Sequence, residues 1–283
     1  MTKILLSLGH GYSARALSRR LLDDGWRVIG TTRNAEKTVA IRETGAEAVI
    51  WPGTDLAPLL AEATHLLTSA APDADGDPVL RALGSSIAAQ KFAWVGYLST
   101  TGVYGDRGGE WVDETSHCHP ATERGAWRLA AEQSWAALDL PLHIFRLAGI
   151  YGPGRGPFSK VRNGSAQRII KPGQVFSRIH VEDIATVLMA SIATPNPGAI
   201  YNVCDGEAAP PQDVLAYAAE LLGVPAPPEV DFDKAEMSPM ARSFYAESKR
   251  VSNRRIVEEL GVKLAYPNYR SGLKALLDAD QGR

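Results

Sequence analysis

Short apolar runs alternate with amphipathic segments along the first half of the chain. Apolar runs bounded by turn residues are typical of strands that are buried on both faces of a parallel sheet. The amphipathic segments between them predict helices that cross from one strand to the next. The predicted strands are Lys3–Leu8, Arg27–Thr31, Ala46–Trp51, His65–Ser69, Phe92–Ser99 and Leu142–Leu147.

The predicted helices have recognisable ends. Gly25 follows the predicted helix Tyr12–Asp24, and Gly45 follows the next one, because glycine is favoured just after a helix C-terminus. Asp77-Pro78 supplies an N-cap and a first-turn proline. Right-handed crossovers between the strands then predict the α/β class, with a doubly wound parallel sheet, the Rossmann fold.

The rhythm of strands and helices breaks at Tyr151, where glycine and proline become frequent. We expect residues 1–150 to form a dinucleotide-binding Rossmann core. Residues 151–283 should combine the remaining core elements with a smaller C-terminal substrate lobe. The elements predicted there are one strand, Ala199–Val203, and four helices, Val181–Ala193, Pro211–Leu222, Ser248–Leu260 and Arg270–Leu277.

Composition is that of an ordinary globular protein: 45% of the 283 residues are hydrophobic and 22% are charged. The formal net charge of -2 provides no overall basic field, so nucleic acid is not an expected partner. Cys118 and Cys204 are too few for a disulfide framework or a zinc site. No apolar stretch approaches the roughly 20 residues that cross a bilayer. We expect a cytoplasmic protein without a membrane partner.

A glycine-rich turn joins the first predicted strand to the first predicted helix. Gly9-His10-Gly11-Tyr12-Ser13-Ala14 matches the pattern G-x-G-x-x-A of dinucleotide-binding proteins. Gly9 permits the tight turn, and Gly11 lets the backbone approach the pyrophosphate. The phosphates would lie at the helix N-terminus, where amides are unpaired. Residues 9–13 are therefore predicted to bind a dinucleotide, and the alternative is a plain turn.

The end of the second predicted strand favours NADP. An acidic residue there would hold the ribose 2′-hydroxyl of NAD, but the chain reads Gly30-Thr31-Thr32-Arg33-Asn34. Arg33 with Thr31 and Thr32 could instead surround a 2′-phosphate, and Thr32, Arg33 and Asn34 are predicted to bind the cofactor. NAD stays possible, because Arg33 could also be a solvated loop cation.

The stretch from Tyr97 to Gln133 carries the frame of a reductase site. It reads Tyr97-Leu-Ser-Thr-Thr-Gly-Val-Tyr104-Gly105 and then, after a loop, Arg124-Gly-Ala-Trp-Arg128-Leu-Ala-Ala-Glu132-Gln133. This pattern resembles the extended short-chain dehydrogenase/reductases, the NAD-dependent epimerase/dehydratase family, whose helix carries Tyr-x-x-x-Lys-x-x-x-Glu. The chain resembles an atypical member, with Arg124 at the tyrosine position and Arg128 at the lysine position.

Further segments resemble this family in the same order along the chain. The resemblance implies that Asp55 and Leu56 contact the adenine, and that Ala70 and Ala71 lie beside the cofactor. Gly149, at the exit of the sixth predicted strand, is also expected to contact the cofactor. The remaining similar segments are Arg146–Gly154, Arg178–Ala185 and Gly198–Val203.

The resemblance also implies roles at the reaction centre. Thr100 falls at the position of the Ser or Thr that holds the substrate oxygen, with Thr101 beside it, and Arg128 could hold the ribose hydroxyls. Arg124 cannot replace the tyrosine, because a guanidinium offers no exchangeable proton near neutrality. It could stabilise an oxyanion or bind a phosphate or carboxylate. The alternative for Arg124, Arg128 and Glu132 is an exposed ionic stripe.

Three other proton donors are candidates: Tyr104, Tyr151 and the pair His117 and His119. The alternative is that these residues have no catalytic role: the tyrosines would pack at the rim of the core, and the histidines would be solvated in turns.

Residues 152–178 contain six cations and no acidic residue. Such a segment beside the cofactor would attract an anionic substrate, or it could be a solvated surface. Its glycines and prolines make it a candidate mobile lid. The six cations are Arg155, Lys160, Arg162, Arg168, Lys171 and Arg178.

We therefore expect an NAD(P)-dependent oxidoreductase or sugar epimerase/dehydratase-like enzyme with a rearranged active site, acting on an anionic small molecule. The alternative, motivated by the missing tyrosine, is a non-catalytic NADP(H)-binding redox sensor. The resemblance also suggests a homodimer that packs through the helix containing Arg124–Leu138. The predicted catalytic residues are Thr100, Thr101, Tyr104, Arg124 and Arg128.

Overall fold

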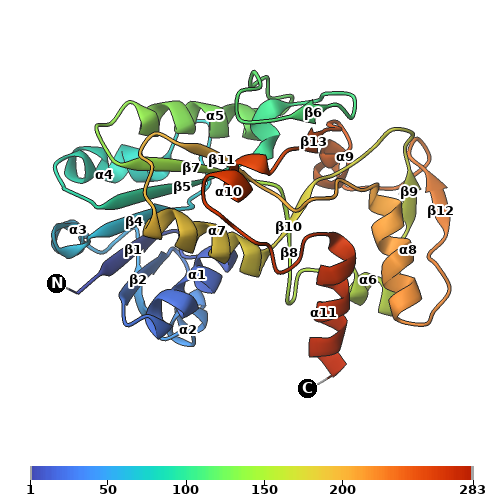
Figure 1. Cartoon of the computed structure of the whole chain (residues 1–283), viewed down its shortest axis with the longest axis horizontal. Coiled ribbons are helices and arrows are strands. Elements are labelled where there is room, and N and C mark those ends of the chain that lie inside the picture. The colour runs from blue at the N-terminus through green and yellow to red at the C-terminus, as the bar shows by residue number, and fades with distance from the viewer. Residues whose placement is uncertain (1, 282–283) are drawn as a thin grey trace.

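The structure is a computed structural model of the chain, and it describes residues 2–281. A seven-stranded sheet lies at its centre, in the order β11-β7-β5-β4-β1-β2-β3, and every neighbouring pair in it is parallel. Helices cover both faces of this sheet (Figure 1). The predicted doubly wound parallel sheet is confirmed. Its strands are β1 (Ile4–Leu8), β2 (Arg27–Thr32), β3 (Glu47–Ile50), β4 (His65–Thr68), β5 (Trp94–Thr100), β7 (Leu142–Leu147) and β11 (Ile200–Val203).

Each face of the sheet has its own apolar core. Leu17 and Ile184, both fully buried, belong to the core under one group of helices, and Ile87 and Trp135 to the core under the other. The first group is α1 (Tyr12–Asp23), α2 (Lys37–Arg42) and α7 (Val181–Ala193). The second is α3 (Ala57–Glu62), α4 (Pro78–Ala88) and α5 (Glu123–Ala136).

The predicted helix ends are present. Gly25 and Gly45 have φ angles of +76° and +89°, the left-handed conformation that favours glycine after a helix. The Asp77 side chain accepts hydrogen bonds from the backbone N–H groups of Val79 and Leu80, so it caps α4 as expected.

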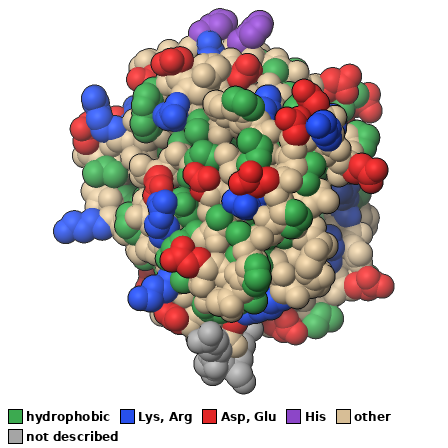
Figure 2. Space-filling model, turned by 90° about the vertical axis from the view of Figure 1, so that its right-hand side faces the viewer, with side chains coloured by type: hydrophobic (Ala, Val, Ile, Leu, Met, Phe, Trp, Pro, Cys, Tyr) green, Lys and Arg blue, Asp and Glu red, His purple; other side chains and the backbone are tan. Residues whose placement is uncertain are grey.

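The chain beyond Tyr151 does two things. Its segment α7–β11 returns to the central sheet, and much of the rest forms a separate apolar cluster around Phe158, Ala218 and Leu273. Acidic and basic side chains are interspersed over this end of the molecule (Figure 2). The remaining elements are β6 (Trp111–Val112), β8 (Gly149–Tyr151), α6 (Phe158–Arg162), β9 (Arg168–Ile170), β10 (Arg178–His180), α8 (Pro211–Leu221), β12 (Glu229–Asp231), α9 (Pro239–Phe244), β13 (Arg250–Val251), α10 (Arg254–Glu258) and α11 (Tyr269–Gln281).

The predicted helix Ser248–Leu260 is wrong in its first half. Its start is extended, because β13 pairs in parallel with β6 and the Val251 N–H donates to the Ser177 hydroxyl at 3.0 Å. Only the five residues of α10 are helical. Tertiary pairing here outweighs local helix propensity.

Among residues 2–281, no helix is both long enough and apolar enough to cross a membrane.

Candidate functional site

Two cavities share a wall at the carboxyl ends of β5 and β7. The smaller, of about 290 Å³, reaches the glycine turn after β1, and the larger has about 1290 Å³. Ligands of doubly wound sheets bind outside the carboxyl ends of the strands, where the strand order reverses, as it does here between β1 and β4. The residues that line both cavities are Thr100, Arg128, Leu147, Ala148, Ile150 and Arg155.

The glycine turn forms one wall of the smaller cavity. Gly9 has a φ of +82°, and a Cβ placed on it would lie 2.9 Å from the Ala70 backbone nitrogen. Its carbonyl accepts a hydrogen bond from the Ser69 hydroxyl. Gly11, Tyr12 and Ser13 line the same cavity, at the unpaired amides of the first turn of α1. Backbone can therefore approach a ligand closely here.

The side chain of His10 does not line either cavity. It is 5% exposed and lies against β2, where a Cβ on Gly30 would come within 2.5 Å of the ring. Its Nε2 lies 3.3 Å from the Ser18 hydroxyl oxygen. Burial, with a smaller effect of Arg15, lowers the pKa of His10 to about 4. This predicted cofactor residue is a neutral part of the core, which leaves only its backbone for a ligand.

The predicted adenosine-binding residues lie outside both cavities. Arg33 is exposed, and the Asn34 N–H donates to the Thr32 hydroxyl at 3.2 Å. Asp55 is exposed and accepts from the Ala57 N–H at 3.0 Å, whereas Leu56 is buried. Their contacts with an adenosine stay a prediction.

Thr100 and Thr101 lie where β5 leaves the sheet. The Thr100 hydroxyl accepts a hydrogen bond from the Gly102 N–H at 3.1 Å. Thr101 and Arg124 line the larger cavity, together with Ala71 and Gly149. The structure thus brings the two threonines and the two arginines of the predicted centre to the walls of adjoining cavities.

Arg128 is anchored at the junction of the cavities. Its Nη1 donates to the carbonyls of Leu98 and Ala70 at 3.0 and 3.2 Å and to the Tyr97 hydroxyl at 3.1 Å. The remaining guanidinium donors of a side chain that lines both cavities can serve a ligand.

No protein-family model matches this chain. It is 28% identical over 285 residues to protein YeeZ of Escherichia coli K12, an alignment that covers 95% of this chain and 97% of that protein. A solved structure of a functionally unknown conserved protein from Silicibacter pomeroyi DSS is 65% identical, covers 100% of both chains and has a TM-score of 0.94. This chain and the Silicibacter pomeroyi protein belong to one family.

Two further solved structures carry names that state a chemistry. Human epimerase family protein SDR39U1, solved with NADPH, has a TM-score of 0.76 and 19% identity, over 98% of this chain and 99% of that chain. The dTDP-glucose 4,6-dehydratase of Bacillus anthracis, in complex with NAD, has a TM-score of 0.78 and 16% identity, over 100% and 97%. This chain has the epimerase/dehydratase fold. At such identities the likeness concerns the fold and not the reaction.

Tyr104 does not reach the site that this epimerase/dehydratase fold provides. It is fully buried and lines neither cavity. Its hydroxyl donates to Asn202 Oδ1 at 2.7 Å and accepts from Arg146 Nη1 at 3.0 Å. Burial raises the pKa of Tyr104 to about 12, although Arg146 opposes the shift. This placement removes Tyr104 from the candidate proton donors.

The other predicted donors are also poorly placed. Tyr151 lines the larger cavity, but its hydroxyl donates to the Asn268 carbonyl at 3.4 Å and lies against Gly272 of α11. His117 and His119 are exposed and outside both cavities.

The alternative of an exposed ionic stripe on α5 is wrong. Arg124 is exposed, but Glu132 is 3% exposed and forms an ion pair with the buried Arg146 at 2.8 Å. The Ser99 hydroxyl also donates to Glu132. Glu132 therefore belongs to a buried polar network beneath the site.

The basic segment 152–178 is only partly available to a ligand. Arg162 pairs with Asp280 at 3.1 Å and Arg168 pairs with Glu229 at 3.2 Å. Lys171 donates to the backbone carbonyl of Tyr245, and Arg178 donates to those of Phe176 and Ala209. Arg155 and Lys160 line the larger cavity without such bonds among the described residues.

One ion pair in the larger cavity was not predicted. Lys249 Nζ lies 2.5 Å from Glu247 Oε2 and donates to the Gly105 carbonyl at 2.8 Å. Both side chains line the cavity and are about nine-tenths buried, with 10% and 13% exposure. The sequence signal was Glu-x-Lys, whose members share a face of an extended segment but not of a helix. The predicted helix Ser248–Leu260 included Lys249 but not Glu247, so the pair was not recognised.

Asp205 should make stability fall as pH rises. It is 2% exposed, and burial raises its pKa from 3.8 to about 7, opposed by its backbone bond to Glu207 and by Arg178. The folded state therefore holds a proton that the unfolded state has lost, so the stabilisation present below pH 4 disappears between pH 4 and 7. The difference in melting temperature between the wild type and Asp205→Asn should be constant below pH 4, change to the disadvantage of the wild type between pH 4 and 7, and stay constant above pH 7. Parallel curves would contradict this.

Proposed function

We propose that this protein is an NADP(H)-dependent oxidoreductase or epimerase/dehydratase-like enzyme that acts on an anionic small molecule. One observation carries the proposal. Arg128 stands between a cavity walled by the glycine turn and a larger cavity with a cationic lining. A dinucleotide in the first would present its reactive ring to a substrate in the second.

The residues present fit a nicotinamide dinucleotide. Gly9 packs against the Ala70 backbone with no room for a Cβ, and Gly11, Tyr12 and Ser13 line the smaller cavity, so a diphosphate there can approach the backbone amides at the start of α1. Arg128, which lines both cavities, is the residue that we expect to hold the ribose hydroxyls. Proteins of the same fold are known with NADPH and with NAD. The bound nicotinamide would supply or accept a hydride.

Arg33 supports NADP over NAD, because the end of β2 and the two residues after it, Thr31 to Asn34, include no carboxylate. Arg33→Ala should weaken NADPH binding about 10-fold or more and leave NADH binding nearly unchanged, because it removes a charged partner of the 2′-phosphate. Arg42→Ala, which removes an exposed arginine of α2, is the control. Fluorescence titration with both reduced cofactors measures the effect. Equal losses for the two cofactors would speak against a 2′-phosphate contact.

The charge of the larger cavity supports an anionic substrate. Six cations and two carboxylates contribute to its lining. Such an imbalance attracts phosphates and carboxylates. The cations are Arg124, Arg128, Arg155, Lys160, Arg178 and Lys249, and the carboxylates are Glu236 and Glu247.

The proton relay would be rearranged. Thr100 would hold the substrate oxygen, as its place at the end of β5 allows. Lys249, held by Glu247 inside the larger cavity, is the group we propose for the proton that the tyrosine transfers in the family pattern. The cytoplasmic location, the homodimer and the division near residue 150 stay predictions.

The alternative is a non-catalytic redox sensor, favoured by Arg124 at the tyrosine position. Arg124→Tyr separates the two functions. If the pocket is a damaged enzyme site in which Lys249 replaces the missing tyrosine poorly, the variant should raise nicotinamide oxidation or reduction with ketone, aldehyde or sugar-nucleotide panels by about 10-fold or more, because a well-positioned acid contributes about 10² to 10⁴. Arg124→Phe is the matched control without the hydroxyl. A sensor would stay inert in both variants, yet bind oxidised and reduced cofactor with different affinities.

A further inference from the structure

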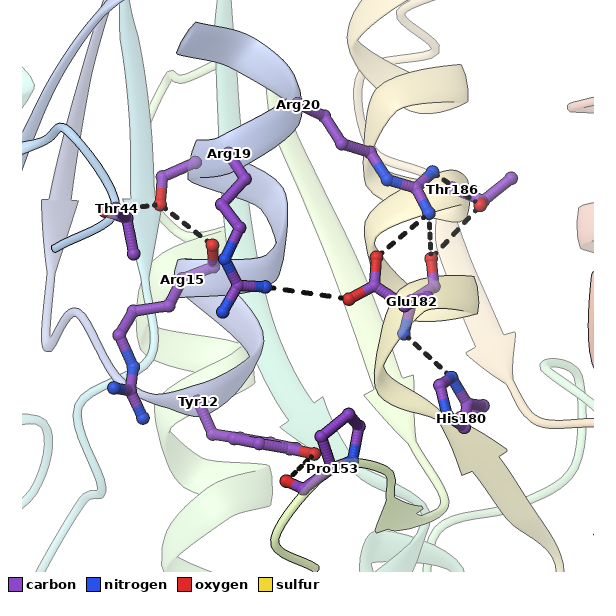
Figure 3. Close-up of polar contacts among 10 residues, drawn as sticks. Tyr12, Arg15, Arg19, Arg20, Thr44, Pro153, His180, Glu182 and Thr186 are labelled. Atoms are coloured by element: carbon purple, nitrogen blue, oxygen red, sulfur yellow. Dashed lines mark hydrogen bonds and ion pairs between the residues drawn. The ribbon is translucent and has the colours of Figure 1, made fainter. Parts of the chain in front are cut away.

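The loop after β8 is fastened to the first turn of α1. The Tyr12 hydroxyl donates to the Pro153 carbonyl at 2.9 Å (Figure 3). The Arg155 guanidinium lies 4.6 Å from the centre of the Tyr12 ring, within cation–π range. Two backbone hydrogen bonds between Gly152 and Arg155, of 2.9 and 2.8 Å, close the loop into a tight turn. We call residues 152–155 with Tyr12 the latch.

The fit of the latch depends on a glycine. A Cβ on Gly152 would lie 2.5 Å from the Tyr12 hydroxyl oxygen and 2.7 Å from Val181 Cγ1. The close approach places the Tyr12 ring and Arg155 together in the wall of the smaller cavity, beside Gly9 and Gly11.

The charge of the smaller cavity is uncompensated. Arg128 and Arg155 line it, and within residues 2–281 no carboxylate does so. None of the ion pairs of the described residues includes Arg155. By contrast, Arg19 and Arg20 of α1 pair with Glu182 of α7 (Figure 3). A cation held by an aromatic ring and left without a carboxylate is suited to a ligand anion.

We propose that Arg155 binds the diphosphate of the dinucleotide, with Tyr12 holding it in place, and that the latch retains the cofactor. This rests on the proposed dinucleotide site. Arg155 also lines the larger cavity, so the same side chain forms part of the substrate wall. Release of the cofactor then requires the turn 152–155 to leave Tyr12.

The test compares Arg155→Gln with Arg162→Gln, a matched loss of a cation from the same basic segment but outside both cavities. Calorimetric titration uses NADPH and ADP-ribose, which keeps the diphosphate and lacks the nicotinamide. Arg155→Gln should weaken both ligands by about 10-fold or more, and Arg162→Gln should leave them within about two-fold. Tyr12→Phe, which loses only the bond to Pro153, should speed NADPH dissociation in stopped flow.

The outcomes separate the two proposals. If the wild type binds no pyridine dinucleotide and no ADP-ribose, the proposed function fails. If the wild type binds and Arg155→Gln behaves like Arg162→Gln, the latch is overturned while the dinucleotide site stands. A loss confined to NADPH, with ADP-ribose unaffected, would also overturn it, because the diphosphate would not be the partner of Arg155.

Discussion

Glu132→Ala should lower the free energy of unfolding by about 3–5 kcal/mol, because it leaves the Arg146 guanidinium buried without its carboxylate. Arg146 is 4% exposed and Glu132 is 3% exposed, so water cannot replace the lost partner. The Ser99 hydroxyl loses its acceptor in the same variant. Urea unfolding followed by circular dichroism measures the change.

The control for this loss is an exposed pair. Glu258→Ala breaks the ion pair with Arg254, whose side chains are 60% and 81% exposed, and should cost no more than about 1 kcal/mol. The double variant Glu132→Leu with Arg146→Met should recover part of the stability, because it removes both buried charges. Equal effects of Glu132→Ala and Glu258→Ala would show that the buried pair does not stabilise the fold.

Gly9→Ala should abolish most of the dinucleotide affinity. The new Cβ meets the Ala70 backbone nitrogen at 2.9 Å, and the φ of +82° is unfavourable for alanine. Backbone strain and overpacking together should cost about 2–4 kcal/mol of stability, and the displaced turn should weaken NADPH binding about 30-fold or more.

Gly25→Ala is the control that introduces backbone strain from a positive φ without a steric clash at the new Cβ. Gly25 has a similar φ of +76°, but no heavy atom lies within 4 Å of its added Cβ. This variant should lose about 1 kcal/mol of stability and bind NADPH like the wild type. If Gly9→Ala also binds NADPH normally, the glycine turn is not the phosphate site.

The sheet could be predicted from the sequence because each strand is a local apolar run. β7 (Leu142–Leu147) is buried at all six positions and begins and ends where it was predicted. The glycine turn could be located because its G-x-G-x-x-A pattern stands between a predicted strand and a predicted helix, although the contact that excludes a side chain at Gly9 is with the distant Ala70. Such features depend on short segments whose composition is visible in the sequence.

The positions of the site's side chains were harder to predict from the sequence, because the burial of a side chain depends on residues that are far away along the chain. Tyr104 is held by Asn202, 98 positions away in sequence, and His10 is covered because Gly30 has no side chain. Lys249 meets the carbonyl of Gly105, 144 positions away. No local pattern reports such contacts, so the burial of these side chains could not be predicted from the sequence.

The return of α7 and β11 to the central sheet affects how this chain folds during synthesis. β11 pairs with the edge of β7, and α7 shares an apolar core with α1. A nascent chain that has emerged only as far as Tyr151 would leave this strand edge and the apolar side of α1 unsatisfied, a state prone to association with other chains. Stable closure of the sheet must therefore wait until Val203 has left the ribosome, which makes the first half dependent on the second.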